Sequence, residues 1–210
     1  MIKAKVRFSL LALLLPLLLN ASHILKNDLL NPQASKLIEE MGNELAEKTD
    51  IHGYVIATNE NFPVKFNLVT YSKKYEDNMS KPYVVLIFAA NARLTEKSTH
   101  RGRIALIPSS TEVGKLYDKG DVIDATIDVV ASKDKNTKED KFNVGIVQGF
   151  SELADQIASA KNVKMTTTIP NDTRYVIRAL QVVVIIGAIL VFWMFLFRPI
   201  YMRIRHGKRK

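Results

Sequence analysis

Residues Tyr83–Ala90 have the sequence YVVLIFAA, eight positions without a charged side chain directly after Pro82. An apolar run of this length without alternation is typical of a central strand that is covered on both faces. Two shorter apolar runs flank it along the chain, YVIAT at Tyr54–Thr58 and RIALI at Arg103–Ile107. We therefore predict three strands, with Tyr83–Ala90 in the interior of the fold.

Stretches with helical spacing of apolar residues separate these strands. One helix is predicted over Gln33–Lys48, with Asn31 as its cap and Pro32 in its first turn. Further helices are predicted over Phe66–Asp77, over Val113–Val130 with a break near Gly120, and over Phe142–Ala160. The intervening Ser132–Lys141 is a polar loop. Helices that alternate with short strands indicate an α/β fold, a layered sheet covered by helices.

The charge of the chain is unevenly distributed. The formal net charge is +9, but residues 23–174 hold all 21 acidic and 20 of the 30 basic side chains, which leaves a net charge of −1 there. The remaining basic residues lie at the two ends, beside apolar runs, as in membrane topology signals. This distribution argues against nucleic acid as a partner, although the basic end can meet anionic lipid. The absence of Cys excludes disulfides and thiolate zinc sites.

The apolar run near the start, FSLLALLLPLLL at Phe8–Leu19, follows three basic residues and precedes Asn20-Ala21-Ser22. Twelve helical residues rise about 18 Å, short of the roughly 30 Å hydrocarbon layer. The pattern predicts a secretory signal peptide over residues 1–21, cleaved after Ala21. An uncleaved N-terminal anchor is the alternative.

The second apolar run, ALQVVVIIGAILVFWMFLF at Ala179–Phe197, has 19 positions without a charge. It rises about 28 Å and predicts a transmembrane helix, against the alternative of a buried core helix. The basic residues that follow predict a cytoplasmic C-terminus. The two runs together predict a single-pass protein of the inner cell membrane whose preceding domain is periplasmic.

Four aspartates recur at spacings of three or four residues, namely Asp118, Asp121, Asp124 and Asp128. Carboxylates on one helical face offer the oxygen ligands that Ca²⁺ prefers. We consider a weak divalent site formed by Asp28, Asp118, Asp121 and Asp124, with calcium as the possible cofactor. The alternative is helix capping and a solvated acidic face.

Five basic residues cluster after the predicted central strand: Arg93, Lys97, His100, Arg101 and Arg103. Guanidinium groups bind phosphate and carboxylate through paired hydrogen bonds. Arg93 and Arg101 are thus candidates for contact with a phosphate or with an acidic partner, and a merely solvated loop is the alternative.

Motifs of the common enzyme classes are absent from the sequence. The histidines lack zinc-ligand spacing, the serines lack a G-x-S-x-G elbow, and no glycine-rich nucleotide loop is present. We therefore identify no catalytic residue and expect no nucleotide to bind.

The order of these segments resembles the TPM domain family, membrane-anchored domains of bacteria and of photosystem II repair proteins. The similarity covers about residues 27–160. It comprises an acidic start at Asn27-Asp28, the first strand at Tyr54, the apolar run after Pro82, and the segment Phe142–Phe150, in which an aromatic residue is followed by G-I and then by a further glycine. The chain departs from the family pattern after two strands, at Asn91-Ala92-Arg93 and at Pro108-Ser109-Ser110.

The resemblance implies a small mixed sheet between helices and a role in the assembly or repair of membrane complexes. Acid phosphatase activity and calcium binding are claimed for some members. The predicted organisation is a signal peptide (1–21), a TPM-like domain (27–160), a linker (161–178), a transmembrane helix (179–197) and a basic tail (198–210). An interaction factor with a membrane-protein partner is the leading hypothesis, and a divalent-ion-dependent phosphatase using Asp28, the aspartates near 118–124 and Arg93 is the alternative.

Overall fold

The computed structural model describes residues 22–98, 101–169 and 172–198. A four-stranded sheet with the order β1-β2-β3-β4 forms its centre. The strands are β1 Ile24–Asn27, β2 His52–Thr58, β3 Tyr83–Ala89 and β4 Arg103–Pro108. The first three are parallel, and β4 runs antiparallel to β3. The predicted α/β class with a small mixed sheet is confirmed.

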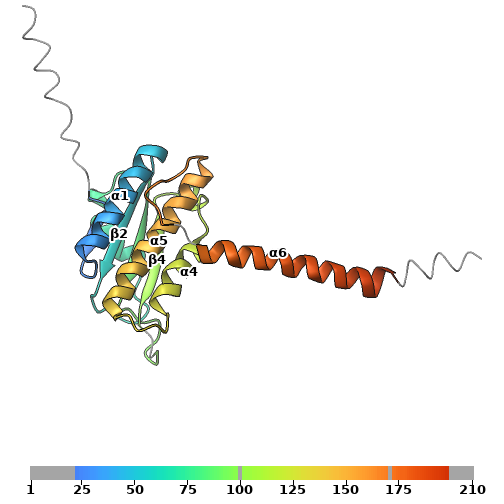
Figure 1. Cartoon of the computed structure of the whole chain (residues 1–210). Coiled ribbons are helices and arrows are strands. Elements are labelled where there is room, and N and C mark those ends of the chain that lie inside the picture. The colour runs from blue at the N-terminus through green and yellow to red at the C-terminus, as the bar shows by residue number, and fades with distance from the viewer. Residues whose placement is uncertain (1–21, 99–100, 170–171, 199–210) are drawn as a thin grey trace, which may run out of the picture. The chain divides into compact units, whose positions relative to one another are not determined.

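Helices cover both faces of this sheet. On one face lie the three long helices, α1 Pro32–Thr49, α4 Lys119–Val130 and α5 Lys138–Ala160 (Figure 1). On the other face lie the short α2 Leu68–Ser72 and the 3-10 helix η1 Lys73–Asn78. One turn of helix, α3 Thr111–Gly114, follows β4.

Strand β3 is the central element, as its sequence predicts. All seven of its residues are buried. Val84, Leu86 and Phe88 pack with the core under the long helices, whereas Val85 and Ile87 pack with the core under α2. The strand thus contributes apolar side chains to both cores, which explains why its sequence does not alternate.

Two glycines allow α4 and α5 to approach each other closely. A Cβ atom on Gly149 would lie 1.9 Å from the Thr126 hydroxyl, and one on Gly145 would lie 2.7 Å from Val130. The missing side chains of α5 therefore make room for the backbone of α4, which joins the two helices into one layer.

Several predicted boundaries differ from the structure. The strand β1 was not predicted, because ILKN is short and has no apolar run. The predicted helix over Phe66–Asp77 is divided into α2 and η1. The predicted break near Gly120 lies earlier, because the side chain of Asp118 accepts a hydrogen bond from the backbone N–H of Asp121 and caps α4.

Residues 161–169 are bound to the domain, although we predicted a weakly structured link there. The Glu44 carboxylate of α1 accepts hydrogen bonds from the backbone N–H groups and the hydroxyls of Thr166 and Thr167. Farther along, Ser151 of α5 both donates to the carbonyl of Ile169 and accepts from its N–H group. We call this docked segment, residues 161–169, the strap.

The chain after the strap forms a separate unit, residues 170–210. It contains α6 Asp172–Phe192, followed directly by the π-helical segment η2 Trp193–Phe197. The predicted uncharged helix over 179–197 is therefore divided between these two elements. Within residues 22–98, 101–169 and 172–198, no helix combines the length and apolar character needed to cross a membrane. The predicted signal peptide (1–21) and nearly all of the basic tail (198–210) lie outside the described residues.

Candidate functional site

The carboxyl ends of β1, β2 and β3 lie at one edge of the sheet, because these strands are parallel. The chain leaves β1 into α1, on the face of the long helices, and leaves β2 toward α2, on the opposite face. In α/β sheets, ligands bind outside the carboxyl ends of the strands, where successive connections diverge to opposite faces. The polar residues at this edge, which we call the carboxyl edge, are therefore the candidate site.

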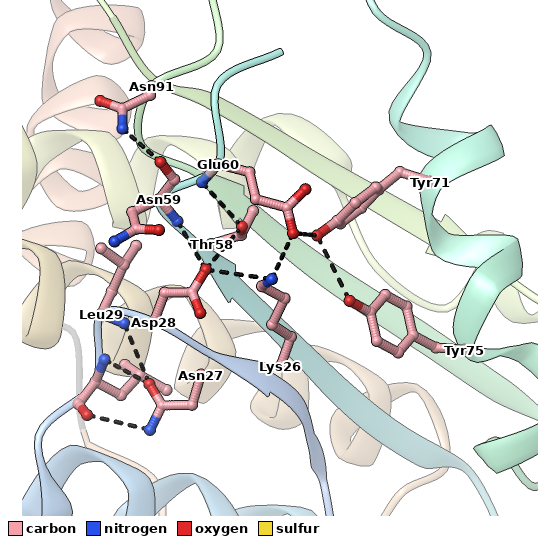
Figure 2. A network of polar contacts seen from close by, with 11 residues as sticks. Lys26, Asn27, Asp28, Leu29, Thr58, Asn59, Glu60, Tyr71, Tyr75 and Asn91 are labelled. Atoms are coloured by element: carbon pink, nitrogen blue, oxygen red, sulfur yellow. Dashed lines mark hydrogen bonds and ion pairs between the residues drawn. The ribbon is translucent and has the colours of Figure 1, made fainter.

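Asp28 directly follows the last residue of β1 and forms hydrogen bonds with residues at the end of β2. Its backbone N–H donates to the carbonyl of Ala57 at 2.8 Å, which extends the strand pairing by one residue. One carboxylate oxygen accepts hydrogen bonds from the Thr58 hydroxyl at 3.1 Å and from the Asn59 N–H at 3.2 Å. Figure 2 shows this oxygen also facing the Lys26 ammonium, 3.4 Å away. Asp28 is thus committed to bonds within the domain.

Lys26 lies between two carboxylates, those of Asp28 and Glu60 (Figure 2). The hydrogen bond to Glu60 raises the pKa of Lys26 above its usual value, despite opposing desolvation. Glu60 also accepts a hydrogen bond from the Tyr71 hydroxyl at 2.9 Å, and the two donors lower the pKa of Glu60. Burial raises the pKa of Tyr71. The tyrosine therefore stays neutral and acts as a donor to Glu60.

Hydrogen bonds between loops fix the rest of the carboxyl edge. The Asn91 side chain donates to the carbonyl of Asn59, which ties the loop after β3 to the loop after β2. The Arg103 guanidinium donates to the carbonyl of Phe66 at 2.6 Å. The loop after β2 is thus bonded both to the loop after β3 and to β4.

The predicted contact residues Arg93 and Arg101 lie on the loop between β3 and β4. The carbonyl of Arg93 accepts a hydrogen bond from the Lys65 N–H at 3.4 Å, and Arg101 is exposed. Among the described residues, neither arginine forms an ion pair within 4.0 Å. Lys26, by contrast, is neutralised by its carboxylates. The two arginines therefore differ from Lys26, whose charge is paired within the domain.

The structure does not bring the four predicted metal ligands together. The Asn31 N–H, three residues after Asp28, donates to Asn143 near the start of α5. The Asp118 N–H donates to Gln156 near the end of the same helix. Thirteen residues of helix separate Asn143 from Gln156, which is about 20 Å. Asp28 and Asp118 therefore lie near opposite ends of α5.

The predicted calcium site of four aspartates stays a prediction. Asp118 is a helix cap, as the alternative interpretation proposed, and Asp121 and Asp124 lie on α4 with it. In the part of the chain that the structure describes, no group of three or more His, Cys, Asp or Glu side chains is placed to hold a metal ion. The phosphatase alternative, which combines Asp28 with the aspartates near 118–124, also stays a prediction, although Asp28 and Asp118 lie near opposite ends of α5.

Sequence reasoning missed Lys26, Thr58 and Glu60. Lys26 belongs to the strand β1, which has no apolar run, so nothing in the sequence placed it in the sheet. Thr58 and Glu60 had a usable signal, because Thr58 ends the predicted strand Tyr54–Thr58 and Glu60 comes two residues later, and polar residues at the carboxyl ends of parallel strands face the edge where ligands bind.

Comparison with known proteins gives no relative for this chain: no family model matches it, and no curated protein matches it.

Proposed function

We propose that this chain is a membrane-anchored, TPM-like domain on the periplasmic side of the inner membrane that acts as an interaction factor in the assembly or repair of membrane protein complexes. The observation that carries the proposal is the apolar surface of α6 and η2. The large apolar side chains described between Val182 and Phe197 are between 52% and 75% exposed. A continuous apolar surface of this extent is unfavourable in water, so we expect lipid or protein to cover it.

A membrane span needs both helical elements. The apolar part of α6, residues 179–192, rises only about 21 Å, which is less than the hydrocarbon thickness. Residues Trp193–Phe197 continue the uncharged run directly from Phe192. We therefore assign the span to α6 and η2 together, with the basic residues after Phe197 on the cytoplasmic side.

The carboxyl edge supports the interaction role over the phosphatase alternative. The carboxylates of Asp28 and Glu60 are both bound by Lys26, and each also accepts a hydrogen bond from a neighbouring hydroxyl. The half-buried Arg93 and the exposed Arg101, on the loop between β3 and β4, carry positive charge that suits an acidic surface of a partner protein.

Extraction of membranes at alkaline pH tests the anchor. The full chain is expected to stay in the pellet, with residues 23–169 open to protease added to the outer face of spheroplasts. A chain that ends at Ile169 is expected in the soluble periplasmic fraction. Release of the full chain by alkali would contradict the anchor.

Crosslinking in intact cells tests the partner. We expect crosslinks from the loop between β3 and β4 to one membrane protein, lost in the double variant Arg93→Glu/Arg101→Glu. The matched control Lys119→Glu/Lys161→Glu reverses two exposed charges at the other end of α5 and should keep the crosslinks. Crosslinks without a reproducible partner would count against the interaction role. Turnover of a phosphomonoester that is lost in Asp28→Asn would favour the phosphatase instead.

A further inference from the structure

The start of the described chain is held firmly against the domain. His23 is 4% exposed, and its Nδ1 atom lies 2.7 Å from the carbonyl oxygen of Gly53. The imidazole fills space above Gly42, where a Cβ atom would lie 2.4 Å from the ring. The carbonyl of His23 accepts a hydrogen bond from Val55 of β2 at 2.8 Å. Residue 23 is thus fixed by both its side chain and its backbone, and it sets the position of residue 22.

The carboxylate of Glu39, on α1, faces this fixed start. One of its oxygens accepts a hydrogen bond from the Ser22 hydroxyl at 2.6 Å, and the other accepts one from the His23 N–H at 2.9 Å. No lysine or arginine in the described ranges forms an ion pair with Glu39. The neighbouring Glu40, in contrast, has Lys36 at 3.7 Å. Glu39 is therefore a negative charge directed at the backbone of residues 22 and 23, without a cation from a side chain.

Signal-peptide cleavage would supply that cation. Hydrolysis of the bond between Ala21 and Ser22 adds one water: the carboxylate stays on Ala21, and the amine stays on Ser22. An α-amino group has a pKa of about 7.7–8.0, so this amine takes up a proton at neutral pH. The resulting ammonium can donate three hydrogen bonds, as a lysine ammonium does. It would arise on the residue whose hydroxyl already contacts Glu39.

We infer that Glu39 is the binding site for the new α-ammonium of Ser22, so that removal of residues 1–21 adds an ion pair that fastens the edge strand β1 to α1. This strand needs such support, because it has four residues and its pairing with β2 is irregular between Ile24 and Lys26. The inference concerns maturation of the chain and rests on the periplasmic placement in the proposed function, but not on the proposed interaction role.

The test compares processed and unprocessed full-length chains that are purified from membranes in detergent. Intact mass and N-terminal sequencing establish the first residue, and Ala21→Leu blocks cleavage by removing the small residue that the cleavage site requires. Glu39→Gln is then introduced into both forms, and Glu40→Gln is the matched control on the same helix. Thermal melting and aminopeptidase trimming are measured for each chain.

We expect the wild-type chain to begin at Ser22. Glu39→Gln should lower the melting midpoint by about 1–3 °C more in the processed chain than in the Ala21→Leu chain, because only the former has the ammonium. Aminopeptidase should remove Ser22 faster from processed Glu39→Gln than from the wild type. Glu40→Gln should change neither measurement.

A chain that retains residues 1–21, or one that begins at another residue, would overturn the inference. Equal effects of Glu39→Gln in processed and unprocessed chains would also overturn it, since the carboxylate would then serve only the hydroxyl of Ser22 and the N–H of His23.

Discussion

Glu44 accepts hydrogen bonds from both the backbone N–H and the hydroxyl of Thr167, at 2.8 and 2.5 Å. The carboxylate is 9% exposed, and Lys48 also donates to it at 2.6 Å. Burial by itself would raise the pKa of Glu44, but the bonds from Lys48, Thr167 and Thr166 outweigh it and hold the pKa well below its usual range. A single ionised side chain thus fastens the strap to α1.

Replacing this carboxylate should loosen the strap. In Glu44→Gln, the amide NH₂ faces donors and leaves bonds unmade, so we expect a loss of about 2 kcal/mol in the free energy of unfolding at pH 7. A depressed carboxyl pKa stabilises the fold above the unfolded pKa of about 4.3, and this contribution is lost as the pH falls toward the folded pKa. The difference between variant and wild type in thermal melts should therefore shrink below about pH 4. The exposed Glu47→Gln on the same helix should show no such difference at any pH.

The second carboxylate under the strap should behave in the opposite way. Asp155 accepts a hydrogen bond from the Thr168 hydroxyl at 2.7 Å. Burial raises the pKa of Asp155, and the charge of Glu44 raises it further, although the bond from Thr168 lowers it. A raised carboxyl pKa destabilises the fold as the pH rises from the unfolded pKa through the folded one. Asp155→Asn keeps an acceptor for Thr168 and removes the charge.

We therefore expect Asp155→Asn to melt at a higher temperature than the wild type at pH 7 and at the same temperature at pH 3. A lower melting temperature at pH 7 would mean that the negative charge itself, rather than the hydrogen bond, secures the strap.

The contact between α4 and α5 should tolerate no side chain at residue 149. In Gly149→Ala, the Cβ atom would lie 1.9 Å from the Thr126 hydroxyl, so the helices must separate. Such overpacking costs about 1–3 kcal/mol, which exceeds the gain of about 1 kcal/mol from the better helix propensity of alanine. Urea unfolding should show the loss, and Gly187→Ala, with no neighbour within 4 Å, should show none. Adding Thr126→Ala should recover part of the stability of Gly149→Ala, whereas purely additive losses would place the strain elsewhere.

The separation of Asp28 from Asp118 can be tested energetically. Asp28→Ala removes an ion pair with Lys26 and two hydrogen bonds, and Asp118→Ala removes a helix cap worth about 1 kcal/mol. Because the two residues lie near opposite ends of α5, the two losses should add within about 0.5 kcal/mol in a double-mutant cycle of urea unfolding. The cycle should give the same result with calcium present. A coupling that appears only with calcium would restore a shared site.

The elements that were predicted best are those whose sequence pattern lies within the element itself. The predicted strand Tyr83–Ala90 ends one residue beyond β3, because a strand buried on both faces needs an unbroken apolar run. The predicted helix Gln33–Lys48 lies within one residue of α1 at each end, and the Asn31 cap is confirmed by its bond from the Ala34 N–H. In both cases the residues that define the element lie inside it or directly beside it.

The elements that were missed depend on partners that are distant in the sequence. The strap is ordered by Glu44, more than a hundred residues before it, and a run of threonines gives no sign of that contact. The role of Asp118 was open for a different reason, because the spacing of Asp118 and Asp121 fits a helix cap as well as a ligand pair, and the structure shows the cap. Asp28 and Arg93, which the phosphatase alternative groups, follow the parallel strands β1 and β3, and their grouping stays a prediction.

The two hydrogen bonds between Ser151 and Ile169 determine where the docked strap ends. Only two residues, Pro170 and Asn171, separate Ile169, the docked end of the strap, from the start of α6 at Asp172, so the Cα atoms of Ile169 and Asp172 are at most about 11 Å apart. If α6 and η2 span the bilayer as we propose, this short link ties the domain to the membrane that holds its partner, and the partner is met at a high effective concentration. A partner that is free in solution would gain no such advantage.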